Sequence, residues 1–231
     1  MNVYVMSDLH GEGELFHAML KQIQFSDKDQ LYIIGDVIDR GANGINLLLE
    51  IMETPNIQMI LGNHEYMMLQ YLSPDATEVD VRRWNKNGNA PTLEAFQKLE
   101  PELRKKVLAF LHSCPVHTDL NVDDNPFFLV HGFPGKDVHD CVWQRPALDT
   151  ENPVPGTTLI VGHTPVPNLL YPSMEDNEII AEMTAKGTLP EILHATGFID
   201  IDCGCSFDKP LKTLGCLRLN DMTAFYEHGT I

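Results

Sequence analysis

Residues 31–41 read LYIIGDVIDRG, and this stretch decides which fold the sequence predicts. Its first four residues are apolar and stop at a glycine and Asp36, as expected of a buried strand that runs into a loop. The loop then places a second carboxylate, Asp39, beside the guanidinium of Arg40. Glycines at both ends permit a tight backbone and the close approach of a ligand. A carboxylate such as Asp36 can bridge two cations, and Arg40 offers a planar fork that suits a phosphate.

The same pattern, an apolar run that stops at polar side chains, recurs elsewhere in the chain. The other runs cover residues 3–6, 57–61, 127–130 and 158–161. Five strands that deliver polar side chains at their carboxyl ends predict an α/β fold with its site along one edge of a sheet. Residues 14–24 and 45–52 place apolar side chains near helical spacing, so we expect them to be crossover helices.

The length of 231 residues fits a single catalytic domain that covers residues 1–231. Residues 66–125 lack the apolar runs that stop at polar side chains. They are richer in helix formers and include a helix candidate at residues 101–112. We expect this segment to form a helical insertion that flanks the cleft. Three further strands are expected near the end of the chain, the last two joined as a hairpin, at residues 197–202, 213–219 and 222–227.

The composition describes an ordinary globular protein with an acidic surface. The chain is 43% hydrophobic and 21% charged, and its formal net charge is -17. Because nucleic-acid binding depends on Lys and Arg that neutralise phosphates, this charge disfavours a nucleic-acid partner. The sequence has no signal-peptide pattern at its amino terminus and no apolar run of the roughly 18 residues that a membrane span needs. We therefore expect a cytoplasmic protein with no membrane partner.

The polar residues after the other runs are of metal-ligand types. Asp8 and His10 follow the first run, where strand alternation sends both side chains to the same side and lets them share one metal. Asn63 and His64 follow the run at residues 57–61. Adjacent side chains at a strand end diverge, so Asn63 can face a metal while His64 faces the leaving group of a substrate.

Two further histidines each close an apolar strand. His131 or His163 alone would fit a structural core histidine better than a ligand, but together with the earlier motifs they indicate a metal site. The candidate metal ligands are Asp8, His10, Asp36, Asn63, His131 and His163. This mixed set of oxygen and nitrogen donors suits Mn²⁺, Fe or Zn²⁺ rather than Ca²⁺.

Five motifs, in the order SDLHG, GDVIDRG, GNHE, HG and GHTP, resemble those of the metallophosphoesterases of the PPP serine/threonine phosphatase family. The compact bacterial and phage branch is the most similar. The resemblance spans about residues 1–205, but residues 164–196 offer no motif that we can interpret. It implies a four-layer α/β sandwich, with two mixed β-sheets flanked by helices and a binuclear metal centre.

The resemblance also implies how the two metals are held. One metal would be bound by Asp8, His10 and Asp36, and the other by Asp36, Asn63, His131 and His163. Asp36 would therefore be the bridge. Two divalent ions are implied, with Mn²⁺ as the expected metal and Fe or Zn²⁺ as alternatives.

Other residues match the catalytic and substrate-binding positions of the family. His64 is similar to the general acid, and Asp39 to the residue that orients it. Substrate phosphate would be bound by Arg40, Asn63 and Arg145, the last within a Trp-Gln-Arg segment that resembles the second arginine motif of the family. The expected reaction is an in-line attack by a metal-bridging hydroxide, with His64 protonating the leaving group.

The expected substrate is a phosphorylated protein or peptide that carries phosphoserine or phosphothreonine, with phosphotyrosine also open. The nearest alternative on the same scaffold is a symmetrical dinucleoside polyphosphate hydrolase. Asp39 and Glu65 favour the phosphatase, because those hydrolases typically depart from the family pattern at both positions. A third reading is a binding protein without catalysis, which is disfavoured because a competent residue occupies every position of the inferred site.

Overall fold

In the computed structural model, which describes residues 1–229, the first apolar run forms the central strand of a five-stranded sheet. All residues of this strand, β1 (Val3–Met6), are buried, as expected where both faces of a sheet are covered. β1 pairs in parallel with β2 (Gln30–Ile33), which pairs in parallel with β3 (Ile57–Met59). An antiparallel hairpin of β9 (Thr213–Arg218) and β10 (Thr223–His228) completes the order β10-β9-β1-β2-β3.

The second sheet is also mixed and has the order β4-β5-β6-β8-β7. Its strands β5 (Asn125–Val130), β6 (Thr158–Val161) and β8 (Ile199–Asp200) run in parallel. Both edge strands, β4 (His117–Val122) and β7 (Leu193–His194), pair with their neighbours in antiparallel. The polar side chains that end β5 and β6 therefore meet at one edge of this sheet.

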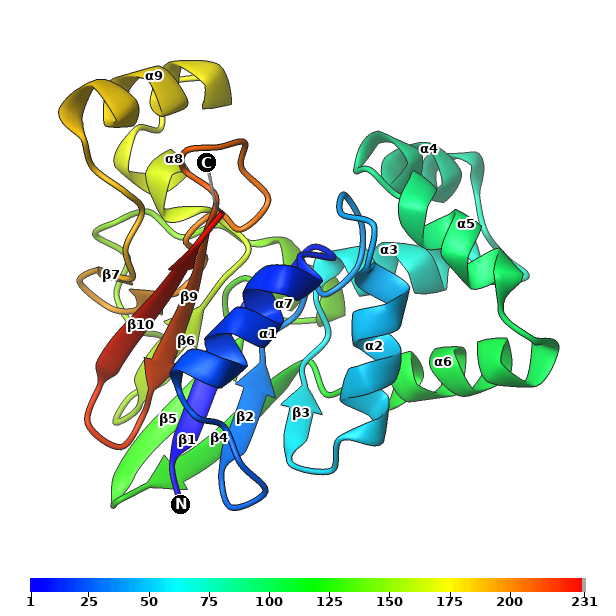
Figure 1. The fold of residues 1–231 in the computed structure, drawn as a ribbon, viewed down its shortest axis with the longest axis horizontal. Helices are drawn as coiled ribbons and strands as arrows, with labels where there is room; N and C mark the ends of the chain where they lie inside the picture. Colours follow the sequence, from blue (N-terminus) through cyan, green and yellow to red (C-terminus); the bar gives the residue numbers. More distant parts are fainter. Residues whose placement is uncertain (230–231) are drawn as a thin grey trace.

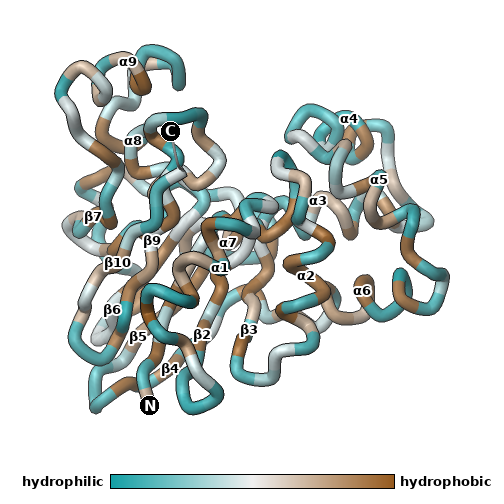
Figure 2. Tube along the Cα trace, viewed as in Figure 1, coloured by the Kyte–Doolittle hydropathy of each residue, from teal (hydrophilic) through white to brown (hydrophobic). Residues whose placement is uncertain are grey.

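The two sheets pack face to face and helices cover their outer faces (Figure 1). One cluster of buried apolar residues, including Val5, Leu129 and Ile160, fills the space between the sheets. Helices α1 (Gly13–Gln22) and α2 (Gly44–Glu53) bury their apolar sides in a second cluster against the outer face of the first sheet. α7 (Val138–Trp143) and α8 (Val166–Leu170) contribute to a third cluster on the outer face of the second sheet. The expected four-layer α/β sandwich is confirmed. Figure 2 shows the hydrophobic colours concentrated along the strands that form these layers.

The expected helical insertion is shorter than predicted at its carboxyl end. Its four helices, which lie together at one side of the molecule beyond α2 (Figure 1), are α3 (Asn63–Tyr71), α4 (Glu78–Lys86), α5 (Ala90–Lys98) and α6 (Pro101–Ser113). The interpretation of residues 117–125 as part of a helical segment was wrong, since β4 lies there. Its exposed and half-buried residues alternate along an edge strand, and Asp123 and Asp124, both with positive φ, form the tight turn into β5. The single catalytic domain stays a prediction.

Residues 164–196, for which the sequence offered no interpretation, contain α8 and α9 (Asp176–Lys186). α9 packs through a small apolar cluster of its own, in which Ile179 and Met183 contact Phe207 and Leu211 of the segment before β9. α9 therefore lies at one corner of the molecule, away from the helical insertion (Figure 1). Within residues 1–229, no helix combines the length and apolar character required to cross a membrane.

Candidate metal centre

The backbone is unusual where the strands end at the predicted site. Ten non-glycine residues among those described have a positive φ, and six of these belong to the predicted site: Asp8, His10, Asp36, Asp39, Arg40 and His163. Each such residue costs about 1–3 kcal/mol unless its surroundings hold it in place. Strained backbone therefore concentrates at this edge of the two sheets, as it commonly does at functional sites.

Two glycines let the strand ends touch one another. A Cβ on Gly35 would lie 2.6 Å from the Cα of Gly62 and 2.6 Å from Nδ1 of His131. A Cβ on Gly62 would in turn collide with the side chain and the backbone nitrogen of Asp36. The loops after β2, β3 and β5 can thus approach closely only because glycine occupies both positions.

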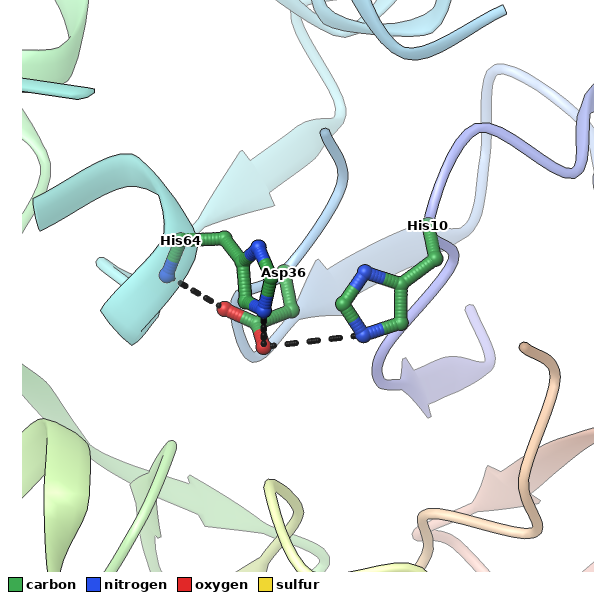
Figure 3. Close-up of side chains that lie close together, drawn as sticks. All are labelled: His10, Asp36 and His64. Carbon is green, nitrogen blue, oxygen red and sulfur yellow. Dashed lines mark hydrogen bonds and ion pairs between the residues drawn. The ribbon is translucent and has the colours of Figure 1, made fainter. Parts of the chain in front are cut away.

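The carboxylate of Asp36 lies at the centre of the predicted ligands. Its Oδ1 is 3.3 Å from Nε2 of His131, and its Oδ2 is 3.7 Å from Nε2 of His10. The same Oδ2 is 3.8 Å from Nε2 of His64, whose backbone N–H donates to Oδ1 at 3.0 Å. Figure 3 shows the rings of His10 and His64 on either side of this carboxylate. Asp36 is therefore shared by imidazoles from the loops after β1 and β5 and from the first turn of α3.

Two groups of buried ligand atoms share Asp36. His10, Asp36 and His64 form one group, and Asp36, His131 and His163 form the other, with the ligand atoms of each group within 4.8 Å of one another. A carboxylate that belongs to two such groups has the position that a bridge between two cations requires. That Asp36 bridges two metal ions stays a prediction.

The other two predicted ligands border these groups. Asn63 places its Oδ1 2.9 Å from Nε2 of His131. Asp8 places its Oδ1 3.9 Å from Nε2 of His10, while its Oδ2 accepts hydrogen bonds from the backbone N–H of His163 and the hydroxyl of Ser7. All six predicted ligands therefore gather at one place. His64, predicted as an acid, stands in the tight group where Asp8 was expected.

The orientation of the imidazoles suits metal binding. Nδ1 of His10 lies 3.1 Å from the carbonyl of Ile38, and Nδ1 of His131 lies 2.7 Å from the carbonyl of Ile34. These contacts fix the rings so that each Nε2 faces the carboxylates, as in many metal sites. Nε2 of His163 is buried and has no hydrogen-bond partner within residues 1–229. Because a buried nitrogen without a partner is costly, and because Asp36 and His131 lie in the same ligand group, this donor set fits divalent cations.

Burial sets the charge of two of the histidines. It disfavours the imidazolium form and, helped by the nearby imidazole of His64, lowers the pKa of His10 well below its usual value. Burial and the neighbouring His131 lower the pKa of His163 to about 2. Both rings are therefore neutral near pH 7, which is the form that binds a metal.

At the centre of the site, the charges of neighbouring groups have a larger effect on the pKa values than burial has. Burial alone would raise the pKa of Asp36, but the imidazoles of His131 and His64 outweigh it and hold this pKa well below its usual range. Burial alone would lower the pKa of His131, but the carboxylates of Asp36 and Asp8 raise it to about 10. Asp36 is thus an ionised carboxylate that is stabilised by a positive charge beside it. A metal ion would supply this charge in place of the proton on His131.

The predicted acid and its predicted partner form a close pair. Nδ1 of His64 lies 2.6 Å from Oδ2 of Asp39, and the indole N–H of Trp84 donates to the same oxygen at 2.6 Å. The backbone N–H of Asp39 donates to the hydroxyl of Thr92 at 2.8 Å. Both Asp39 and His64 are buried. The pair therefore fixes the His64 ring, with its Nε2 turned toward Asp36 and the guanidinium of Arg40, 3.3 Å away.

Both predicted arginines line one polar cleft of about 310 Å³ beside the ligand groups. Arg40 is exposed and donates to the hydroxyl of Ser206 at 2.7 Å. Arg145 is exposed as well, and Asp8 and His163 form the inner wall of the cleft. The third predicted phosphate-binding residue, Asn63, does not line this cleft but lies against His131.

Sequence reasoning missed the residues that brace the site. Glu65 accepts hydrogen bonds from the backbone N–H groups of Asp36, Val37, Ile38 and Gly62 and so ties the loops after β2 and β3 together. Glu65 belongs to the GNHE motif and was used to favour the phosphatase, but no bracing role was predicted for it. No role was predicted for Trp84, Thr92 or Ser206.

A comparison with known proteins identifies the family of this chain. The calcineurin-like phosphoesterase family matches residues 1–187. The chain belongs to this family. Calcineurin-like phosphoesterases use divalent metals, so the chain is a metallophosphoesterase and a hydrolase, as the sequence predicted.

Relatives within the family differ in the activities that their names describe. Serine/threonine-protein phosphatase 2 of Escherichia coli (strain K12) is 28% identical over 59% of this chain and 61% of its own length. The symmetrical bis(5'-nucleosyl)-tetraphosphatase of Haemophilus ducreyi is 32% identical over 57% of this chain and 44% of its own length. The chain thus matches less than two thirds of either relative.

Solved structures agree on the fold. A protein serine/threonine phosphatase from Saccharomyces cerevisiae has a TM-score of 0.60 to this chain, with 12% sequence identity and coverage of 100% of this chain and 80% of that one. At such low identity the similarity shows the fold alone, which is the α/β sandwich described above.

Proposed function

We propose that this metallophosphoesterase is a phosphomonoesterase that removes phosphate from phosphoserine or phosphothreonine in proteins or peptides, with phosphotyrosine as a further possible substrate. The observation that carries the proposal is Asp36, a buried carboxylate shared by two groups of ligand atoms and located beside a cleft with two arginines. Such an arrangement suits the hydrolysis of a phosphate ester without a covalent intermediate.

The proposed metal ligands are the residues that meet around Asp36. They are Asp8, His10, Asp36, Asn63, His131 and His163, with Mn²⁺ as the proposed metal and Fe or Zn²⁺ as alternatives. Two divalent cations held there would lower the pKa of a water molecule and stabilise charge on the oxygens of an in-line displacement. His10 and His163 contribute neutral imidazoles and Asp36 an ionised carboxylate, while His131 would exchange its proton for a metal ion.

His64 is the proposed general acid. Asp39 accepts from Nδ1 and so leaves Nε2 as the atom that can hold a proton toward the substrate. A proton delivered to the departing alkoxide is worth about 10²- to 10⁴-fold in rate. Asp39 is the proposed positioning residue, because its contact with Trp84 holds the pair in one orientation.

Arg40 and Arg145 are the proposed phosphate-binding residues, and Asn63 is proposed to support them from its place beside His131. Arginine binds phosphate through a planar fork of N–H donors. The bond from Arg40 to Ser206 holds the guanidinium within reach of His64, so the donors for phosphate and the proton for the leaving group lie side by side.

The size of the cleft supports the phosphomonoester over the dinucleotide alternative. A volume of about 310 Å³ lies at the lower end of the range of about 300–1,000 Å³ found for ligand pockets. It suits one phosphorylated side chain better than two nucleosides joined by four phosphates. The symmetrical tetraphosphatase activity remains the second candidate, because a relative carries that name.

Two assays test the proposal. The purified protein should hydrolyse p-nitrophenyl phosphate with added Mn²⁺ and lose this activity on chelation; activity that survives chelation contradicts the metal mechanism. A comparison of kcat/KM for a phosphoserine peptide and for diadenosine tetraphosphate then separates the two substrate classes. A higher value for the dinucleotide overturns the phosphatase.

His64→Asn tests the acid. We expect kcat for p-nitrophenyl phosphate to fall by less than kcat for an alkyl phosphoserine peptide, because the alkoxide needs the proton more than p-nitrophenolate does. For the peptide the expected loss is about 10²- to 10⁴-fold. Metal content, measured by elemental analysis, separates this loss from a loss of metal, and equal losses for both substrates would remove His64 as the acid.

A further inference from the structure

The cleft beside the metal centre has an outer wall that no part of the proposed mechanism uses. Asn168 of α8 and Asp176, the first residue of α9, line the same cleft as Arg40 and Arg145. These two residues belong to the part of the chain whose sequence carried no recognisable motif. A substrate whose phosphate reaches the arginines therefore extends its other groups toward this wall.

The wall is connected to the phosphate-binding side of the cleft. Phe207, which lines the cleft, packs against Ile179 and Met183 of α9 in their small apolar cluster. Its neighbour Ser206 accepts the hydrogen bond from Arg40. α9 is thus docked on the same short loop that orients the arginine, so the distance between the wall and the phosphate site is fixed by packing.

The charge of the wall is opposite to that of the arginines. Nδ2 of Asn168 donates to Oδ1 of Asp176 at 2.9 Å, and Oδ2 of Asp176 has no hydrogen bond within residues 1–229. The inner end of the same cleft holds Nε2 of His163, which is 6% exposed and has no partner within the described residues. The cleft therefore has a deep end built for a ligand and an outer end with a free, exposed carboxylate oxygen.

We propose that Asp176 is a specificity-determining residue that selects phosphopeptides with a Lys or Arg close to the phosphorylated residue. The inference rests on the proposed phosphatase function. A cationic side chain beside the bound phosphate meets the Asp176 carboxylate, whereas a second phosphate on the substrate meets a like charge there. The same residue therefore disfavours substrates with several phosphates, such as dinucleoside polyphosphates.

Asp176→Asn tests the charge alone, because the amide oxygen can still accept the hydrogen bond from Asn168. Glu182→Gln is the matched control, since it removes one negative charge from the same helix without lining the cleft. The substrates are three phosphoserine peptides of equal length, with arginine, alanine or glutamate next to the phosphoserine, and p-nitrophenyl phosphate as a substrate with no flanking charge.

We expect Asp176→Asn to lower the ratio of kcat/KM for the arginine peptide over the glutamate peptide by about three- to tenfold, with p-nitrophenyl phosphate hydrolysis unchanged. Glu182→Gln should change this ratio by less than about twofold. Asp176→Lys should reverse the preference and raise hydrolysis of diadenosine tetraphosphate.

The outcomes separate the inference from the proposed function. If the wild-type protein hydrolyses the peptides but Asp176→Asn leaves the ratio as it was, or lowers it no more than Glu182→Gln does, the inference is wrong and the proposed function stands. If the wild-type protein hydrolyses p-nitrophenyl phosphate but none of the peptides, the proposed function is wrong and the inference is overturned with it.

Discussion

The two halves of the candidate site are held in different ways. The first-sheet half consists of the loops that follow β1, β2 and β3, and the second-sheet half consists of the loops that follow β5 and β6 together with residues 164–211. In the first-sheet half, the carboxylate of Glu65 alone accepts four backbone N–H groups, and Asp39 is held by Trp84 and Thr92. In the second-sheet half, Arg145 is exposed and its guanidinium has no hydrogen bond within residues 1–229.

This difference indicates that the two halves of the site have different roles. Buried hydrogen-bond networks hold side chains in one arrangement, as metal binding and proton transfer require. Exposed groups on a wall with its own small core, such as the one around Phe207, can vary without disturbing the metals. We therefore expect substitutions in the first-sheet half, or at the ligands His131 and His163, to abolish the chemistry. Substitutions at the exposed residues of the second-sheet half should change which substrate is preferred.

The largest effect is expected for Asp36→Asn, because both ligand groups contain this carboxylate. Loss of a residue outside the ligand sphere already costs about 10- to 100-fold in metal affinity, so we expect a loss above about 100-fold here. Titration calorimetry with Mn²⁺ measures it. Asp29→Asn is the control, since it replaces a buried carboxylate that lies just before β2 and outside the site. Two metals bound by Asp36→Asn with unchanged affinity would contradict the central position of Asp36.

An effect of about tenfold on kcat is expected for Trp84→Phe, which removes the N–H that donates to Asp39. KM and metal content should change little, because Trp84 contacts neither the ligand groups nor the cleft. Phe96→Leu controls for lost packing, since Phe96 lies in the same apolar cluster and has no bond to the site. If both variants lower kcat equally, Trp84 acts through stability and not through the His64–Asp39 pair.

The first-sheet half is also the part of the site that the sequence predicted best. Asp8, His10 and Asp36 follow apolar runs directly, so the strand ends place them, and parallel pairing of β1 with β2 brings them together. The β9–β10 hairpin was predicted from the strand pattern at residues 213–219 and 222–227, whereas the two mixed sheets were implied by the resemblance to the family. His131 and His163 were predicted for the same reason, since each closes a buried strand of the second sheet.

Contacts that depend on long loops could not be predicted in this way. Trp84 and Asp39 are 45 residues apart, and Ser206 and Arg40 are 166 residues apart, with no periodic pattern that relates their positions. The strand at residues 117–122 was missed because an exposed edge strand carries little apolar signal. The place of α9 depends on its contact with Phe207, which only the folded chain reveals.

A smaller effect is expected for Ser206→Ala, in the second-sheet half. The variant removes the acceptor that holds the exposed guanidinium of Arg40, so we expect KM for a phosphoserine peptide to rise by about three- to tenfold with kcat nearly unchanged. Ser113→Ala, which removes a hydroxyl on the far helix α6, is the control. A loss of kcat as large as that of Trp84→Phe would contradict the claim that the two halves of the site have different roles.

The smallest effect on activity is expected for Asp29→Asn, which should change stability alone. Burial alone would raise the pKa of Asp29, but hydrogen bonds from the backbone N–H of Asn2 and from the N–H and hydroxyl of Ser26 outweigh it and lower this pKa below its usual value. The ionised form is therefore favoured in the folded state, so its contribution is fully present above the unfolded pKa and disappears as the pH falls through the folded value. Urea unfolding at pH 7 should show a loss of about 1 kcal/mol for Asp29→Asn, and this difference should shrink as the pH is lowered and Asp29 becomes protonated in the folded state. Asp27→Asn, at an exposed neighbouring carboxylate, should show neither change.

If Asp29→Asn lowered kcat as well, the bracing of the first-sheet half would extend to the opposite end of its strands. The site could then not be treated as a local network around Asp36.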